Sequence, residues 1–105
     1  MGRNRIELTG RLACAPQVRT TPAGTPILRI EVDCGEGRES LILGVVMAGE
    51  GVRELGARIG AGSTVKVTGT LRTVGRGSRR SRIECVEVLA DSIGELAEGP
   101  GSGNR

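Results

Sequence analysis

The amino-acid sequence predicts an all-β fold that contains one short helix. Three observations lead to this prediction. Several segments alternate apolar and polar residues with the two-residue period of a half-buried strand, one segment spaces its apolar residues as a helix does, and turn-forming residues separate the segments. A chain of 105 residues fits one domain with a thin hydrophobic core.

The first strand is predicted at residues 5–12, "RIELTGRL", where polar and apolar residues alternate strictly. Its inward positions are Ile6, Leu8, Gly10 and Leu12. A glycine inside a strand marks a sharp bend or the close approach of another backbone, as at the corner of a barrel. We therefore expect such a feature at Gly10.

A linker and two more strands follow. The linker, "ACAPQVRTTPAGTP", is rich in turn formers, and its "TPAG" places proline and glycine as a type I turn prefers. The second strand is "ILRIEVD", with Leu28, Ile30 and Val32 inward. The third, "SLILGVVM", is apolar almost throughout, which predicts that a helix or a partner also covers its outer side.

One helix is predicted within "GEGVRELGARIGAGS". Val52, Leu55 and Ile59 recur there at helical spacing, and Gly60 and Gly62 stop the pattern. Two glycines inside the segment lower its intrinsic helix stability, so packing must hold it.

The last two strands flank a segment rich in arginine and glycine. The fourth strand, "STVKVTGTLRT", turns Val65, Val67, Gly69 and Leu71 inward. The fifth, "RIECVEVLADSI", breaks its alternation, because Glu84 and Glu87 cannot share a face at period 2. We expect a β-bulge near Cys85 and Val86 that returns both glutamates to solvent.

Three strands, a short helix and two strands form the element order of the OB-fold, a five-stranded Greek-key barrel that commonly binds oligonucleotides. We therefore expect an OB-fold domain over residues 1–96, with its helix between strands 3 and 4. Residues 97–105 are expected to form a disordered C-terminal tail.

The composition argues against several function classes. The three cysteines, Cys14, Cys34 and Cys85, are widely spaced and the chain has no histidine, so we expect buried or half-buried thiols, no metal and no cofactor. A nucleophilic cysteine would lack its usual base, so we predict no enzyme and no catalytic residues. Because there is neither a signal-peptide core nor a membrane span, a cytoplasmic location without membrane partners is expected.

Positive charge is concentrated in the segment "RTVGRGSRRSR" at residues 72–82. The chain has 15 basic and 12 acidic residues, so removing the five arginines of this segment leaves 10 against 12, a remainder of −2. A basic cluster of this kind points to an anionic partner, and the alternative is a solvated loop in an arginine-rich chain. The absence of Phe, Tyr and Trp removes the rings on which single-stranded bases usually stack.

Three segments of the sequence give more specific evidence about function. "NRIELTGRLACAPQVRTTPAGTPILRIEV", "VVMAGEGVRELGARIGAGSTVKVTGTLRT" and "VLADSI" occur in the order of similar segments in bacterial single-stranded-DNA-binding proteins. Together they span roughly residues 4–93, so the chain resembles this family. The chain stops soon after the fold ends, without the acidic tip of larger members. In this it looks like the small dimeric relatives that help restart stalled replication forks.

The resemblance fails at the aromatic positions. Where the larger family often has a tyrosine, a tryptophan and a phenylalanine, this sequence has Thr20, Ile42 and Ala48. No stacking residue is therefore carried over. The resemblance does imply where nucleic acid would bind, because in this family the hairpin between the fourth and fifth strands closes on the nucleic acid.

The predicted nucleic-acid-binding residues combine this hairpin with basic residues on the outer sides of two strands. They are Arg29, Lys66, Arg72, Arg76, Arg79, Arg80 and Arg82. For Arg29 and Lys66 the alternative is an ordinary solvent-facing charge. Arg5 and Arg11 form either cross-strand ion pairs or nucleic-acid contacts.

These features predict a non-enzymatic homodimer that binds single-stranded DNA without sequence specificity, in DNA replication or in replication restart as a primosome accessory. Its expected protein partners are a replication-restart helicase or other primosome proteins. The alternative is an OB-fold protein–protein adaptor in the replisome that has lost most of its nucleic-acid binding.

Overall fold

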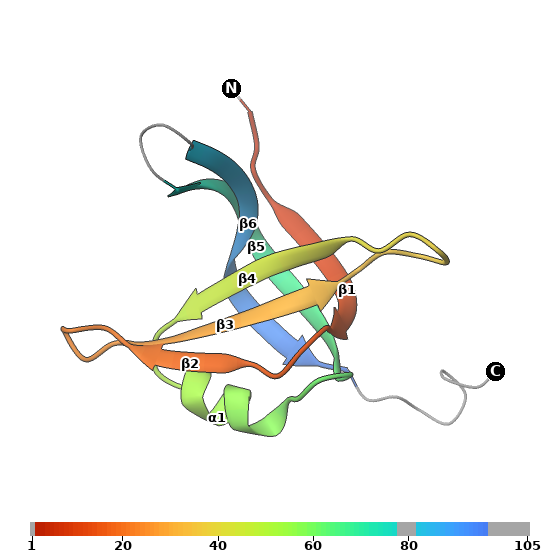
Figure 1. The fold of residues 1–105 in the computed structure, drawn as a ribbon. Coiled ribbons are helices and arrows are strands. Elements are labelled where there is room, and N and C mark those ends of the chain that lie inside the picture. The colour runs from red at the N-terminus through yellow and green to blue at the C-terminus, as the bar shows by residue number, and fades with distance from the viewer. Residues whose placement is uncertain (1, 78–81, 97–105) are drawn as a thin grey trace.

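The strands of the protein pair edge to edge until the sheet closes into a ring (Figure 1). A computed structural model describes residues 2–77 and 82–96, without the side chains of residues 76, 77 and 82–84. Along these residues run β1 (Ile6–Leu12), β2 (Gln17–Thr20), β3 (Pro26–Asp33), β4 (Ile42–Ala48), α1 (Val52–Arg58), β5 (Thr64–Gly77) and β6 (Arg82–Glu95). The predicted fold, mostly β with one short helix, is confirmed for the described residues.

The six strands lie in the order β1, β5, β6, β4, β3, β2, and a further pairing between β1 and β3 closes the ring. The pair β4 and β6 is parallel, whereas the other pairs are antiparallel. The helix α1 follows β4 and contacts β3 and β2, beneath which it lies in Figure 1. It therefore stands between the third and fourth of the five predicted strands, as expected.

The strand β2 lies within the predicted linker, so that part of the prediction was wrong. Its residues pair antiparallel with β3, and the side chain of Val18 packs against the core. Residues 21–24 turn the chain between the two strands, with the amide of Gly24 donating to the carbonyl of Thr21 at 2.8 Å. The predicted turn is therefore present, and it joins β2 and β3 into a β-hairpin.

The inner side of the ring holds the core that the alternation predicted. Fully buried side chains include those of Leu28, Ile30, Val32, Val65 and Val67. The helix contributes Val52 and Leu55, and Ile59 follows at its end, all of them buried. Leu71 is an exception at 38% exposed, because β5 continues beyond the ring at this point.

Gly10 lies where β1 passes from its pairing with β5 to its pairing with β3. A β carbon at this position would overlap the carbonyl oxygen of Asp33. The close backbone approach predicted for Gly10 is therefore confirmed, and it allows the sheet to close.

The irregularity in β6 lies further along the strand than the sequence suggested. Thr68 pairs with Ser92 and Gly69 with Ala90, so Asp91 is the extra residue, and the bulge predicted near Cys85 and Val86 was wrong. Glu87 does not return to solvent either, since it is only 5% exposed. Its carboxylate is paired with arginines, so burial does not leave it unsatisfied.

The outer side of β4 is less covered than its apolar sequence predicted. Leu43, Val45 and Met47 belong to the core, but Ile42 is 49% exposed, and α1 packs on β2 and β3 instead. Among the described elements, β4 packs chiefly against its strand neighbours β3 and β6.

The hairpin of β5 and β6 extends the sheet into the arginine- and glycine-rich segment between the two predicted strands, since β5 runs past its predicted end at Thr73. Residues 72–77 continue β5, and β6 begins at Arg82. The predicted tail, residues 97–105, lies outside the described residues, as do residues 78–81. Among the described residues there is no helix with the length and hydrophobicity that crossing a membrane requires.

We predict that Gly69→Ala lowers the free energy of unfolding by about 1–3 kcal/mol, because the new β carbon overlaps the carbonyl oxygen of Leu89 across the bulge. Gly94→Ala is the matched control in the same hairpin, since a β carbon there meets no atom within 4 Å. Urea unfolding monitored by circular dichroism measures both. Equal stability of the two variants would contradict the close approach at Gly69.

Candidate nucleic-acid interface

Two of the predicted cations, Arg29 and Arg72, lie on one surface of the sheet. The outward positions of β3, β4, β6 and β5 form two neighbouring rows across these strands. One row is Glu31, Gly44, Glu87 and Arg72, and the other is Arg29, Val46, Leu89 and Thr70. We call these eight residues the outer face. The strand pairing thus brings together residues that are far apart in the sequence.

Glu87 lies between the two arginines. Nη1 of Arg29 donates to Oε2 of Glu87 at 3.0 Å, while Nε and Nη2 of Arg72 donate to Oε1 at 3.1 and 2.8 Å. The side chain of Glu87 is 7% exposed, against 30% for Arg29 and 45% for Arg72. We call these three residues the Glu87 cluster. Its two arginines and one glutamate leave a net charge of +1.

Gly44 makes room for this cluster. A β carbon at this position would lie 2.8 Å from Nη2 of Arg29, which is closer than real side chains allow. The Arg29 guanidinium therefore crosses β4 over Gly44 to reach Glu87 on the neighbouring strand. The side chain of Arg29, and not a helix, therefore covers the outer side of β4 at Gly44.

The charge state of Glu87 follows from its neighbours. Burial raises the pKa of this carboxyl, but the hydrogen bonds from Arg72 and Arg29 and their positive charges outweigh burial and hold the pKa below its ordinary value. Glu87 is therefore ionised at neutral pH.

Lys66 is not part of the Glu87 cluster. Its Nζ lies 3.0 Å from Oε2 of Glu7 on β1, and both side chains are at least half exposed. Lys66 and Arg72 are both on β5, but six residues separate them, which is roughly 20 Å along a strand. The structure therefore does not bring Lys66 to the Glu87 cluster.

The remaining predicted cations belong to the end of the β5–β6 hairpin. Arg76 is in β5, with Ile83 as its backbone partner, and Arg82 begins β6 opposite Gly77. Arg79 and Arg80 lie outside the described residues. Among the predicted cations whose side chains are described, all three are paired with carboxylates.

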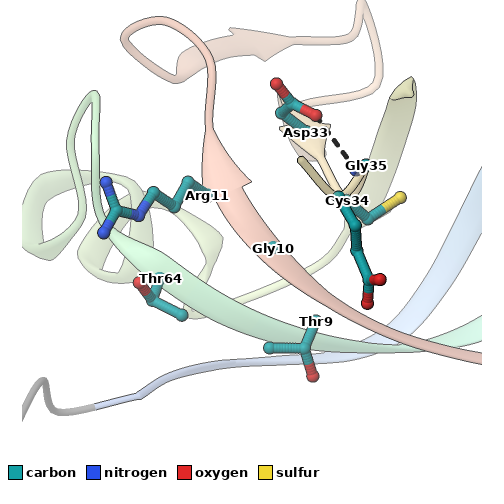
Figure 2. A pocket seen from close by; sticks show the side chains of 8 residues that line it. Thr9, Gly10, Arg11, Asp33, Cys34, Gly35 and Thr64 are labelled. Carbon is teal, nitrogen blue, oxygen red and sulfur yellow. Dashed lines mark hydrogen bonds between the residues drawn. The ribbon is translucent and has the colours of Figure 1, made fainter. Parts of the chain in front are cut away.

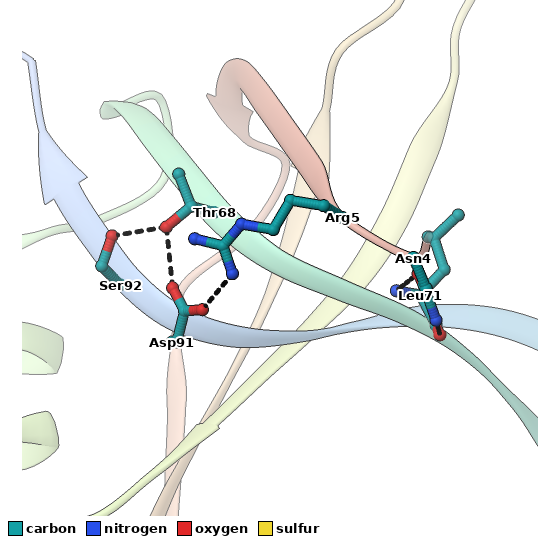
Figure 3. Close-up of polar contacts among 6 residues, drawn as sticks. All are labelled: Asn4, Arg5, Thr68, Leu71, Asp91 and Ser92. Carbon is teal, nitrogen blue, oxygen red and sulfur yellow. Dashed lines mark hydrogen bonds and ion pairs between the residues drawn. The ribbon is translucent and has the colours of Figure 1, made fainter. Parts of the chain in front are cut away.

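Polar contacts fix the other side of this hairpin to Asn4 and Arg5, the two residues before β1 (Figure 3). The Asn4 amide donates to the carbonyl of Leu71 at 2.7 Å and accepts from its amide at 2.9 Å, as a paired strand residue would. Nη1 of Arg5 lies 2.7 Å from Oδ2 of Asp91, whose other oxygen accepts from Thr68. These hydrogen bonds, from Arg5 first, lower the pKa of Asp91. Of the two alternatives for Arg5, the structure shows the ion pair.

Two further cations, Arg19 and Arg53, were not among the predicted residues. Arg19 lines a shallow hollow with Thr20, Thr21, Pro22 and Ile27, and Arg53 of α1 donates to the hydroxyl of Thr20. Arg19 stands in the "VRTTP" stretch that carries the family resemblance, so a signal for it was present. Arg53 had no signal, because only the fold brings α1 beside β2.

A larger hollow of about 400 Å³ opens beside the end of β3 (Figure 2). Asp33 at its wall accepts from the amides of Gly35 and Leu41 at 3.1 and 3.3 Å, and the Gly35 hydrogen bond is the main cause of its lowered pKa. This carboxylate therefore holds the connection between β3 and β4. None of the predicted nucleic-acid-binding residues lines the hollow.

The cysteines differ from the expectation in part. Cys34, at the same hollow, is half-buried as predicted, but Cys14 and Cys85 are exposed. Cys14 follows the end of β1, and Cys85 lies in the part of β6 that pairs with β5 beyond the ring, where little covers either thiol. The described residues contain no group of three or more His, Cys, Asp or Glu side chains arranged to hold a metal ion.

Comparison with protein-family models finds no match to this chain, and comparison with curated proteins finds no significant match.

We predict that Glu87→Gln lowers the free energy of unfolding at neutral pH by about 1–2 kcal/mol, because both arginines lose their charged partner and one loses its acceptor oxygen, while both remain able to meet water. The folded-state pKa of Glu87 lies below the ordinary 4.5, so its contribution is present above that pH and is lost as the pH falls through the folded-state value.

The variant should therefore lose less stability than the wild type between neutral pH and acid pH. Thermal unfolding over a pH series measures this difference. Glu54→Gln, an exposed change in the first turn of α1, is the control and should follow the wild-type pH profile. A profile for Glu87→Gln that parallels the wild type would show that the carboxylate is not held by its arginines.

Proposed function

We propose that this protein is a non-enzymatic OB-fold protein that binds single-stranded DNA through the phosphate backbone. The observation that carries the proposal is the continuity of two basic features. The outer face holds Arg29 and Arg72, and Arg72 stands on the same hairpin that carries the four further arginines of residues 72–82.

The strand pairing supports the OB-fold assignment. Apart from the short β2, five strands pair in a closed ring, and the helix lies between the third and fourth of them. OB-folds bind oligonucleotides on the face of their second and third strands and with the connections between strands 1 and 2 and between strands 4 and 5. In this chain those parts are β3 and β4, the connection that contains β2, and the β5–β6 hairpin.

The chemistry of this surface favours backbone contact over base recognition. Arginine pairs with phosphate through a planar fork of N–H donors and can also stack on a base. Leu89 and Ile42, 40% and 49% exposed, offer aliphatic surface near the arginines, but the chain offers no aromatic ring. Because ring stacking contributes about 1–3 kcal/mol per base in other single-strand binders, we expect weak binding that is indifferent to sequence.

The proposed setting is DNA replication or replication restart. The sequence resembles the bacterial single-stranded-DNA-binding family and, in its layout, primosomal replication protein N. By that resemblance we propose a cytoplasmic homodimer that works beside a restart helicase or other primosome proteins.

We predict that fluorescence anisotropy detects binding of labelled oligo(dT) at low salt and that salt weakens it steeply. If the four hairpin arginines beyond Arg72 each contact a phosphate, the slope of log affinity against log salt is about −3, at roughly 0.7 per charge. Replacing Arg79 and Arg80 by alanine should then weaken low-salt binding by at least tenfold and reduce the slope by about 1.4.

The matched control replaces Arg38 and Arg58 by alanine. These two arginines lie in the β3–β4 connection and at the end of α1, so the variant loses the same charge elsewhere on the molecule. It should bind within about threefold of the wild type. No binding at low salt, or equal losses in both double variants, would overturn the proposal.

A protein–protein adaptor is the second candidate function. It is favoured by the exposed Leu41 and Ile42 at the start of β4, 53% and 49% exposed, and by the pairing of Arg29, Lys66 and Arg72 with carboxylates. Pull-down from a nuclease-treated lysate separates the two functions, because an adaptor keeps its protein partner while a complex bridged by DNA does not.

A further inference from the structure

Glu87 is a buried carboxylate at a position of the outer face that has apolar neighbours. The residue two positions further along β6 on the same side is Leu89, and the residue opposite Leu89 on β4 is Val46, so apolar side chains are tolerated here. A buried carboxylate, even when paired with arginines, rarely stabilises a fold more than an apolar side chain of similar size would. Stability alone therefore gives a weak reason for a buried carboxylate at this position.

The contacts of Glu87 resemble those that a phosphate makes with arginine. An oxyanion group with a negative charge lies between two guanidinium groups and accepts N–H bonds of 2.8 to 3.1 Å from both. Arginine offers the same forked donors to carboxylate and to phosphate. The sides of Arg29 and Arg72 that face each other are thus already occupied by an anion of the protein itself.

We propose that Glu87 acts as an internal substitute for a nucleic-acid phosphate and so weakens the binding of single-stranded nucleic acid to the outer face. This inference rests on the proposed function. Glu87 cancels one of two positive charges, and its own burial at 7% exposure prevents water from screening it as it would screen a surface carboxylate. The arginines, at 30% and 45% exposed, remain within reach of a ligand.

The pairing with Glu87 still leaves both arginines able to contact a phosphate. Arg29 gives one N–H group to Glu87 and Arg72 gives two, whereas a guanidinium carries five. The remaining donors can meet a phosphate without displacing Glu87. Glu87 therefore lowers the affinity of the surface and leaves the contact possible, which favours rapid exchange of the strand.

The test is the affinity of Glu87→Gln for labelled oligo(dT), measured by anisotropy over a salt series beside the wild type and Glu54→Gln. The amide retains one acceptor oxygen and carries no charge, so at least one arginine is released. We expect low-salt binding about three- to tenfold tighter than the wild type and a salt slope steeper by about 0.7, the value of one further phosphate contact. Glu54→Gln raises the net charge equally and should stay within about twofold.

Each outcome is decisive. Binding by Glu87→Gln that is tighter than that of both the wild type and Glu54→Gln supports the inference. If the wild type binds and Glu87→Gln matches Glu54→Gln or binds more weakly, the inference is overturned and the proposed function stands. If neither the wild type nor Glu87→Gln binds, both are overturned.

A second variant covers the case in which Glu87→Gln does not fold. Replacing both Arg29 and Glu87 by methionine keeps the net charge, fills the space with apolar atoms and leaves Arg72 without the carboxylate. If Glu87 holds the arginines back, this double variant should bind within about twofold of the wild type. A loss of threefold or more, with a salt slope reduced by about 0.7, would show that Arg29 was a full contact and overturn the inference.

Discussion

The carboxylate of Glu87 carries its charge on a side chain that is almost wholly buried, and several features of the sheet are arranged around it. A buried charge requires partners, and here they come from Arg29 on β3 and Arg72 on β5. On its way to Glu87 the Arg29 guanidinium passes over Gly44, where a β carbon would lie 2.8 Å from Nη2. One ion cluster therefore links side chains of three strands, β3, β6 and β5, on the outer face and fixes where two arginines present their charge.

This constraint links the fold to the proposed activity. The strand ladders place β3, β4, β6 and β5 side by side, and the β5–β6 hairpin continues from the Glu87 cluster beyond the ring. A strand of nucleic acid that follows this surface meets the half-neutralised arginine pair of the Glu87 cluster first and the arginine-rich hairpin next. The binding that we propose is therefore governed by which charges are already paired, more than by their number in the sequence.

The alternation of residues sufficed to predict the core of β3 and β5, the helix and the close approach at Gly10. It did not suffice for β2, which has a single inward apolar residue, Val18, among turn formers. The irregular pattern of β6 was visible, but its cause was not. A prediction from the alternation of residues places each glutamate at a solvent-exposed position. Glu87 is buried instead, because the folded sheet brings two arginines to it from 58 and 15 residues away in the sequence. The same reason made Arg29 and Arg72 look like free cations.

The most direct test of the central claim, that the outer face and the β5–β6 hairpin form the nucleic-acid surface, is amide chemical-shift mapping by NMR during titration with oligo(dT) at low salt. We predict the largest shifts at Arg29, Val46 and Leu89 and along the hairpin from Arg72 onward, with little change around Asp33 and Gly35. Shifts confined to the hollow at Asp33 and Gly35, or no shifts at all, would contradict it.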